Sequence, residues 1–243
     1  MKKLIPLLLL SLTWTSLAQP PDSPVRVVMN GFVANNVIAG SVTAVATKSD
    51  ILSLETTGFA NLEKKTTMPP DALFWIASMT KPMAAVCVLQ LQEAGKLSIE
   101  DPVEKHLPEF AGQWMVEARA KGKLTLKKPA RATTIRDLLT HTSGLPNTNS
   151  PRPESTLAEL VMSYSKTPLQ FEPGDRWSYS NAGINTLGRI VEVVSRTPFA
   201  DYLQTHVLDP CGMKDTTFWP SPAQAKRIAT SYRPDSDGKL QPV

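Results

Sequence analysis

A serine and a lysine stand three residues apart in the segment FWIASMTKPMAA, residues 74–85, which holds no other charged side chain. On a helix, Ser78 and Lys81 would project from one face about 5–6 Å apart at Cβ, so the hydroxyl and the amine could share a hydrogen bond. A serine hydroxyl is a poor nucleophile until a neighbouring group takes its proton. Lysine takes that proton at neutral pH only if burial or the helix dipole lowers its pKa.

The sequence around Lys81 contains no acid within nine residues on either side. An unpaired ammonium in apolar surroundings is costly, so this lysine either reaches solvent or has a chemical task. Free amide groups at the start of a helix could also stabilise an oxyanion formed beside Ser78. The same residues equally fit an ordinary helix start, with Ser78 as the N-cap and Lys81 on the surface. The pair alone therefore leaves both interpretations open.

Context separates this pair from two others with the same spacing, because Ser-x-x-Lys occurs three times in the chain. Ser163 and Lys166 end a polar helical segment just before a Thr-Pro pair, and Ser236 and Lys239 lie in an Asp-Gly turn. Both fit a solvated surface. Only Ser78 and Lys81 open an apolar helical segment.

A tyrosine and an asparagine in the segment GDRWSYSNAG favour the chemical interpretation. Tyr179-Ser180-Asn181 is the only Tyr-x-Asn in the chain, and it lies between a Pro-Gly turn and a helical segment. A loop in this position could present a phenol and an amide. A nearby lysine cation favours the phenolate of Tyr179, which could then accept or relay a proton. The amide of Asn181 could hold Lys81 or a substrate carbonyl.

Helices must position these groups. Residues 78–94 are apolar nearly all round and end at Gly95, which predicts a buried helix with a glycine cap. Pro82 fits only in the first turn, so the helix must begin close to Ser78. Further helices are predicted near 24–38, 134–143, 156–165, 185–195 and 198–207, the second of these segments with Thr134 and Asp137 as a capping box.

The β-structure expected from the sequence is sparse. Residues 41–48 and 51–59 predict one hairpin. Residues 118–131 carry six cations and no acid, which we interpret as a solvated loop, with contact to an anionic surface as the alternative. No second hairpin is apparent, so the sheet is small for so much helix.

The N-terminus predicts export. Lys2 and Lys3 precede an apolar run, and the small residues Ser16 and Ala18 follow, as in a signal peptide cleaved after Ala18; a retained anchor is the alternative. The formal net charge of +4 falls to +2 without residues 1–18. We therefore expect a periplasmic or secreted protein with no stable membrane span and no nucleic-acid partner. The oligomeric state is left open. Cys87 fits as a small buried side chain, and a bridge to Cys211 is the less favoured alternative.

Other catalytic constellations are weaker. The chain has no Gly-x-Ser-x-Gly nucleophile elbow and no His-Glu-x-x-His, so neither an α/β-hydrolase nor a zinc protease is indicated, and no metal or cofactor is expected. His141 lies close to Ser143 and Asp137, but we interpret it as a helix C-terminal residue that complements the dipole. Trp75 and Trp177 flank the two motifs and fit pocket walls or core equally well.

Taken in order, ASMTK, LLTHTSGL and YSNAG resemble the motifs of the β-lactamase-related serine hydrolases, which include class C β-lactamases, D-alanyl-D-alanine carboxypeptidases, D-aminopeptidases and esterases. The likeness covers most of residues 24–243. It implies an α/β plus all-α fold of the β-lactamase/penicillin-binding-protein type, an antiparallel sheet flanked by helices, with a helical subdomain at roughly 82–170. It also implies Ser78 as the acylated nucleophile, Lys81 as its proton partner, Tyr179 as the base and Asn181 as a group orienting lysine or substrate.

In one respect the chain departs from this family. Members carry a Lys-, His- or Trp-x-Gly element on a later strand that supplies a second oxyanion amide, and nothing after Asn181 matches it. We therefore expect residues 19–243 to be the N-terminal part of such a domain, with C-terminal strands missing, and inactive as a fragment. The expected substrates are small esters, peptides or β-lactams, with a lean toward the esterase and peptidase members. The alternative is a catalytically silent binding or regulatory module.

Overall fold

The computed structural model describes residues 23–120, 122–147 and 154–243. The predicted signal peptide, residues 1–18, lies outside the described residues. The chain divides into two compact units, one formed by the described residues up to Trp75 together with Ser221–Val243, and the other by Ile76–Pro220. The subdomain range of roughly 82–170 stays a prediction. No helix among the described residues has the length and apolar character needed to cross a membrane.

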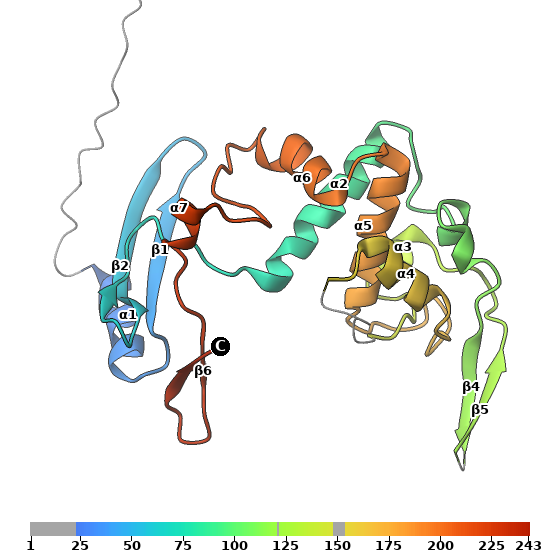
Figure 1. Cartoon of the computed structure of the whole chain (residues 1–243), viewed down its shortest axis with the longest axis horizontal. Helices are drawn as coiled ribbons and strands as arrows, with labels where there is room; N and C mark the ends of the chain where they lie inside the picture. The colour runs from blue at the N-terminus through green and yellow to red at the C-terminus, as the bar shows by residue number, and fades with distance from the viewer. Residues whose placement is uncertain (1–22, 121, 148–153) are drawn as a thin grey trace, which may run out of the picture. The chain divides into compact units, whose positions relative to one another are not determined.

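The first unit is built on an antiparallel sheet in the order β1-β2-β3 (Figure 1). Helix α1 (Pro24–Ala34) precedes β1 (Gly40–Ala46), β2 (Ile51–Asn61) and the short β3 (Thr66–Thr67). The expected hairpin is confirmed, with Gly40 opposite Gly58. Gly58 has φ +66°, and a Cβ there would lie 2.3 Å from the carbonyl oxygen of Ala39, so this position requires glycine.

The last residues of the chain pack back onto this sheet. Helix α7 (Pro222–Ala225) is followed by β6 (Tyr232–Pro234) and β7 (Leu240–Pro242). Leu73 pairs with this segment, accepting from Ala229 N–H at 2.8 Å and donating to the Arg227 carbonyl at 2.9 Å. Ala60, Met68 and Ala229 form the small core of this unit.

The second unit is mainly helical. A 3₁₀ turn η1 (Ala77–Met79) leads directly into α2 (Thr80–Glu93). Two further 3₁₀ turns, η2 (Val103–Lys105) and η3 (Pro108–Phe110), precede the strands β4 (Met115–Ala120) and β5 (Lys123–Lys127). The remaining helices are α3 (Ile135–Leu139), α4 (Leu157–Ser165), α5 (Asn181–Ser195), α6 (Phe199–Leu203) and the π-helical turn η4 (Gln204–Leu208).

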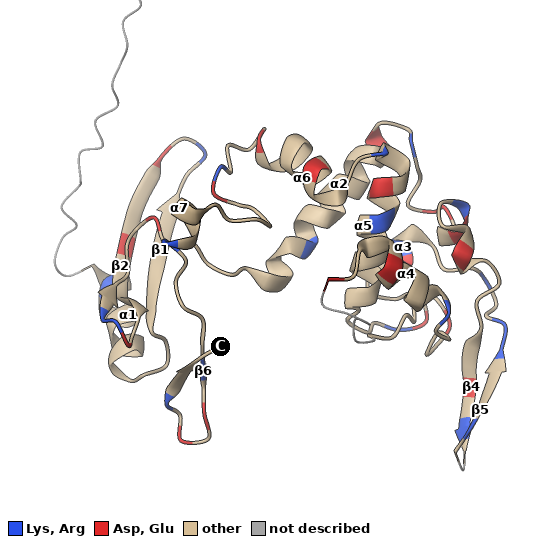
Figure 2. Ribbon diagram, in the orientation of Figure 1, with Lys and Arg blue, Asp and Glu red and all other residues tan. Residues whose placement is uncertain are grey.

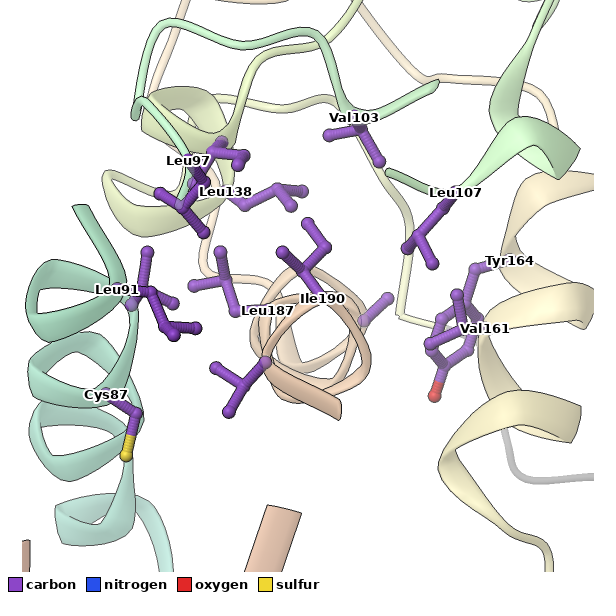
Figure 3. Packing of buried hydrophobic residues seen from close by; sticks show 14 of the residues in the cluster. Cys87, Leu91, Leu97, Val103, Leu107, Leu138, Val161, Tyr164, Leu187 and Ile190 are labelled. Carbon is purple, nitrogen blue, oxygen red and sulfur yellow. The ribbon is translucent and has the colours of Figure 1, made fainter. Parts of the chain in front are cut away.

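The core of this unit is organised around α5. Leu187 and Ile190 of α5 lie between Leu91 of α2 on one side and Tyr164 of α4 on the other (Figure 3). The three aliphatic side chains, Leu91, Leu187 and Ile190, are almost completely buried, and burying each of them stabilises the fold by about 1.5–3 kcal/mol. Cys87 also belongs to this core and is a free thiol, as is the exposed Cys211. The interpretation of Cys87 as a buried apolar residue is therefore confirmed.

The predicted helices are found, with some shifts at their ends. Pro82 falls in the first turn of α2, and Thr134 with Asp137 forms the capping box of α3, both as predicted. Helix α5 begins four residues earlier than expected, because the Ser180 hydroxyl accepts from the Gly183 N–H and caps it. Helix α3 ends at Leu139, so the assignment of His141 to this helix is wrong.

The expectation of a single hairpin is also wrong. Residues 118–131 are not a loop throughout, because β4 and β5 pair antiparallel and carry half of the cations of that stretch (Figure 2). Lys123, Thr125 and Lys127 alternate with Leu124 and Leu126, which is the two-residue period of a strand. Strands β6 and β7 form a third hairpin around the Asp-Gly turn at Gly238.

Candidate active site

Ser78 stands at the junction between the first turn and the long helix of the second unit. It is the middle residue of η1, and the residue before it, Ala77, has φ +44°, a conformation that alanine rarely adopts. The backbone N–H of Ser78 donates no hydrogen bond within the described part of the chain. The serine therefore presents both a hydroxyl and a free amide at one point, which is the pairing that acyl transfer requires.

Lys81 lies one turn further along and faces the same way. Its Nζ donates to Ser78 Oγ at 2.8 Å. Helix α2 is anchored beyond this turn by Ala84, Cys87, Val88 and Leu91, which are buried, and this fixes the direction in which its first turn points. The predicted contact between the serine and the lysine is thus present in the structure, on one face of one helical segment.

Tyr179 comes to the same place from a different part of the chain. The ammonium of Lys81 lies 4.8 Å from the centre of the Tyr179 ring. The pKa of the Tyr179 phenol is lowered, first by its hydrogen bond with Lys81 and then by the one with Ser78. A phenol so placed has an unusually accessible phenolate, which can accept a proton from a neighbouring hydroxyl.

Asn181 occupies the first turn of α5, and its environment differs from the expectation. Its backbone N–H donates to Asn147 Oδ1 at 2.6 Å, and the Asn147 side-chain amide donates to the Tyr179 carbonyl at 2.9 Å. Among the described residues the Asn181 side chain makes no hydrogen bond to Lys81. Its amide is exposed to solvent and free to meet a substrate. Orientation of Lys81 by Asn181 therefore finds no support in this geometry, and its substrate role stays a prediction.

His141 is a member of this cluster that the sequence interpretation missed. Its ring centre lies 4.7 Å from that of Tyr179, with the planes tilted by 34°. Its Nδ1 accepts from the Ser180 N–H at 3.1 Å, and its carbonyl accepts from the Ser178 N–H at 2.8 Å. Burial, followed by the charge of Lys81, lowers the pKa of this imidazole. The signal in the sequence was the segment HTSG, whose glycine and polar residues indicate a turn after α3.

The cluster is more open than the sequence predicted. Ser78 is exposed, Tyr179 is 40% exposed, and Lys81 is partly buried, so the three side chains lie close to solvent. Trp177 is also exposed at 66%, which excludes the core-packing alternative for this residue, and its ring centre lies 6.3 Å from that of Tyr179. Trp75 is likewise exposed rather than part of a core.

Other candidate sites carry less chemistry. Ser163 donates to the Leu160 carbonyl within α4, and Ser236 lies in the turn between β6 and β7, so neither is presented as a nucleophile. A cavity of about 270 Å³ lies beside the β4–β5 hairpin, lined by Val103, Phe110, Lys128 and Thr133 among others, and includes none of the cluster residues. Within the described residues no group of three or more His, Cys, Asp or Glu side chains could hold a metal ion.

Comparison with known proteins identifies the class to which this fold and cluster belong. Residues 25–243 match the family model described as Beta-lactamase. The chain belongs to this family of serine hydrolases, and both the family and the fold predicted from its motifs are confirmed.

Curated relatives have varied names. The chain is 35% identical over 221 residues to Protein Rv1367c of Mycobacterium tuberculosis, covering 84% of this chain and 54% of that protein. It is 33% identical over 222 residues to Esterase EstB of Burkholderia gladioli, covering 85% and 52%. It is 31% identical over 199 residues to Penicillin-binding protein 4* of Bacillus subtilis, covering 78% and 40%. The chain thus spans about half the length of these relatives or less.

Solved structures of hydrolases have a similar fold. EstCE1, described as a hydrolase with promiscuous acyltransferase activity, superposes with a TM-score of 0.76 at 26% identity, covering 90% of this chain and 58% of that one. The D-amino acid amidase from Ochrobactrum anthropi superposes with a TM-score of 0.68 at 26% identity, covering 88% and 56%. The similar folds thus include both a hydrolase with acyltransferase activity and an amidase.

Proposed function

We propose that the protein is a serine hydrolase that forms an acyl-enzyme at Ser78 with small ester, amide or β-lactam carbonyl compounds. The observation that carries this proposal is the 2.8 Å hydrogen bond from Lys81 to the Ser78 hydroxyl beside the Tyr179 phenol. Three groups that could provide a nucleophile, a cation and a base meet at one exposed point. Membership in a family that includes esterases and amidases supports this reaction class.

In the proposed acylation, the Tyr179 phenolate takes the proton from Ser78 Oγ as this oxygen attacks the substrate carbonyl carbon. Lys81 donates to Ser78 Oγ in the observed geometry, so an ammonium at this position stabilises the phenolate and the serine oxygen but cannot itself take the proton. The tetrahedral intermediate then collapses, the bond to the leaving group breaks, and the phenol returns the proton to that group. Water attacks the acyl-serine by the same route in reverse order.

The negative charge on the carbonyl oxygen requires hydrogen-bond donors. The Ser78 backbone N–H has no acceptor within the described residues and lies on the reacting residue itself, so we assign it as one donor. The cluster is open to water on the exposed side of Ser78. Because a water-filled site weakens electrostatic stabilisation, we propose that the 243-residue chain by itself is inactive in turnover.

The substrate class and the location are further parts of the proposal. The esterase and the hydrolase with acyltransferase activity among the similar proteins favour ester substrates over β-lactams. The basic residues and apolar run at the start of the sequence support export to the periplasm or the medium.

Covalent labelling tests the proposal. The protein as the cell produces it is incubated with a fluorescent fluorophosphonate, which traps activated serines, and with a fluorescent penicillin. We expect a labelled protein whose adduct maps to Ser78 by peptide mass spectrometry. Ser78→Ala should remove the label, whereas Ser163→Ala, which alters the serine of another Ser-x-x-Lys segment, should retain it.

Two outcomes would contradict the proposal. The first is a folded protein that takes no label with either probe, which would favour the silent binding module. The second is a label that survives Ser78→Ala. Rates of hydrolysis of a short-chain ester, a D-alanyl dipeptide and a cephalosporin then rank the substrate classes.

A further inference from the structure

His141 has a backbone conformation that its residue type does not favour. Its φ is +60°, in the left-handed region where residues with a Cβ are strained, and it follows α3 by two residues. A strained conformation of this kind persists only where the surrounding contacts require it. The contacts of His141 show what requires it here.

Both residues that flank Tyr179 donate their backbone N–H to His141. Ser178 donates to the His141 carbonyl at 2.8 Å, and Ser180 donates to the imidazole Nδ1 at 3.1 Å. The left-handed conformation allows the carbonyl and the ring of one residue to face the same short segment. His141 therefore holds the chain immediately before and immediately after the phenol.

The imidazole also packs against the phenol itself. The two ring centres lie 4.7 Å apart, and the Trp177 ring meets the imidazole edge-on at 6.1 Å with the planes at 79°. Tyr179 otherwise has an exposed ring on an irregular segment, which could adopt several rotamers. One imidazole face thus restricts the ring to the side where Lys81 and Ser78 lie.

Resting on the function proposed above, we infer that His141 is a positioning residue that holds the Tyr179 phenol against Lys81 and Ser78. It does so through two backbone hydrogen bonds and one ring contact. It acts through Tyr179 and does not touch the reacting atoms.

This role requires a neutral imidazole. Nδ1 accepts the Ser180 N–H, so a proton on Nδ1 would break that hydrogen bond. The titratable groups that face the ring are Lys81 and the Tyr179 phenol, and the Lys81 charge opposes a second cation beside it. Burial acts in the same direction and keeps the pKa of His141 below its usual value.

The test measures the titration of Tyr179, which does not depend on activity. Tyrosinate absorbance is measured against pH in the parent protein and in each His141 variant, and again in the same proteins with Tyr179→Phe added. The difference between the two titration curves of a pair is the titration of Tyr179. His141→Gly removes the ring and Nδ1 while tolerating positive φ, so the backbone is not strained. His141→Asn also tolerates this conformation and keeps an oxygen near the position of Nδ1 as an acceptor.

We expect His141→Gly to raise the apparent pKa of Tyr179 by about one pH unit or more. Without the imidazole, the Tyr179 phenol moves away from the Lys81 ammonium, whose charge favours the phenolate. His141→Asn should recover part of this shift. The matched control is His206→Asn, since His206 also stacks on a tyrosine, Tyr202, with ring centres 4.0 Å apart, but belongs to η4. This control should leave the Tyr179 titration unchanged.

An unchanged Tyr179 titration in folded His141→Gly would overturn the inference, whatever the labelling of Ser78 shows. Conversely, a shifted titration in a protein whose Ser78 takes no label would retain the positioning role and contradict the proposed function. If the Tyr179 titration shifts and Ser78 is also labelled, the rate of Ser78 labelling by the fluorophosphonate should fall by about tenfold in His141→Gly at neutral pH. This corresponds to a one-unit rise in the pKa of the Tyr179 base. Circular dichroism of each variant confirms that it is folded.

Discussion

Lys81 and Tyr179 meet at 4.8 Å between the Nζ atom and the ring centre, although one belongs to the start of α2 and the other to the segment before α5. Helices α2 and α5 pack against one another through buried aliphatic side chains (Figure 3). The start of α2 and the segment that leads into α5 therefore meet at a fixed point. The proposed chemistry depends on this meeting.

Acylation of Ser78 should become faster as the pH rises. The Tyr179 phenolate is the proposed base, and Lys81 followed by Ser78 lowers the pKa of this phenol below its usual value near 10. Below that lowered pKa, the phenolate fraction, and with it the labelling rate, should increase about tenfold for each pH unit. The rate of fluorophosphonate labelling, measured between pH 6 and pH 9, tests this rise with pH.

Tyr179→Phe should abolish the increase of the labelling rate with pH and reduce the rate itself about 10²–10⁴-fold. Tyr164→Phe is a suitable control, because Tyr164 lies in the core on α4, away from the cluster. If the labelling rate of Tyr179→Phe still rises with pH as in the parent protein, the base is a group other than Tyr179.

Asp137 should be the most sensitive polar position for stability in the second unit. It is 4% exposed, accepts two hydrogen bonds from Arg131 at 2.6 and 2.9 Å, and closes the capping box with Thr134. Asp137→Ala leaves these donors without their acceptor and should lower the free energy of unfolding by about 2–3 kcal/mol, since the half-exposed Arg131 can then be hydrated. Urea denaturation measures the change.

The matched control for Asp137→Ala is Glu159→Ala, which opens the corresponding capping box of α4 at an exposed position. This variant should lose only about 0.5–2 kcal/mol. Equal losses at the two positions would show that the ion pair of Asp137 with the half-exposed Arg131 adds nothing to the stability.

Asp101 should protect the fold against acid. Burial alone would raise the pKa of this carboxyl, but the hydrogen bonds from Lys105, the Ser98 amide and His106 outweigh it and lower the pKa to about 2. The unfolded chain therefore binds more protons than the folded one between about pH 4 and pH 2, so this contribution is present above pH 4 and is lost as the pH falls through that window.

Asp101→Asn should remove about 2 kcal/mol of stability at neutral pH and flatten the acid limb of the stability curve. Asp235→Asn offers a comparison, since the pKa of Asp235 is lowered chiefly by its hydrogen bond from Gln241 at an exposed turn. Urea midpoints at pH 2, 4 and 7 distinguish the two variants. An acid limb that is identical in Asp101→Asn and the parent chain would contradict the prediction.

The two cysteines should differ in reactivity in the native protein. Cys87 is completely buried in the core, and burial raises the pKa of its thiol to about 11, whereas Cys211 is exposed. A thiol-specific reagent at pH 8 should therefore modify Cys211 quickly and Cys87 only after unfolding. The number of modified thiols is measured over time by intact mass, and Cys211→Ser serves as the control in which only Cys87 can react. Rapid modification of Cys87 in the folded protein would show that the core opens readily.

Local patterns were sufficient for much of the fold. The placement of Pro82, the capping box of Thr134 and Asp137, and the hairpin after Gly40 follow from rules that act within a few residues, and the structure confirms them. The β4–β5 hairpin was missed because its high charge suggested a loop, while its alternating Lys and Leu residues carried the strand signal.

The sequence by itself determined which residues had to be considered: a serine and a lysine at helical spacing, and one tyrosine two residues before an asparagine. It could place Lys81 beside Ser78, because three residues on one helix fix that distance. It could not show that Tyr179 reaches them, that the cluster is exposed, or that His141 holds Tyr179 from both sides. Those relationships join segments far apart in the chain, and only the packing of α5 against α2 and the turn after α3 brings them together.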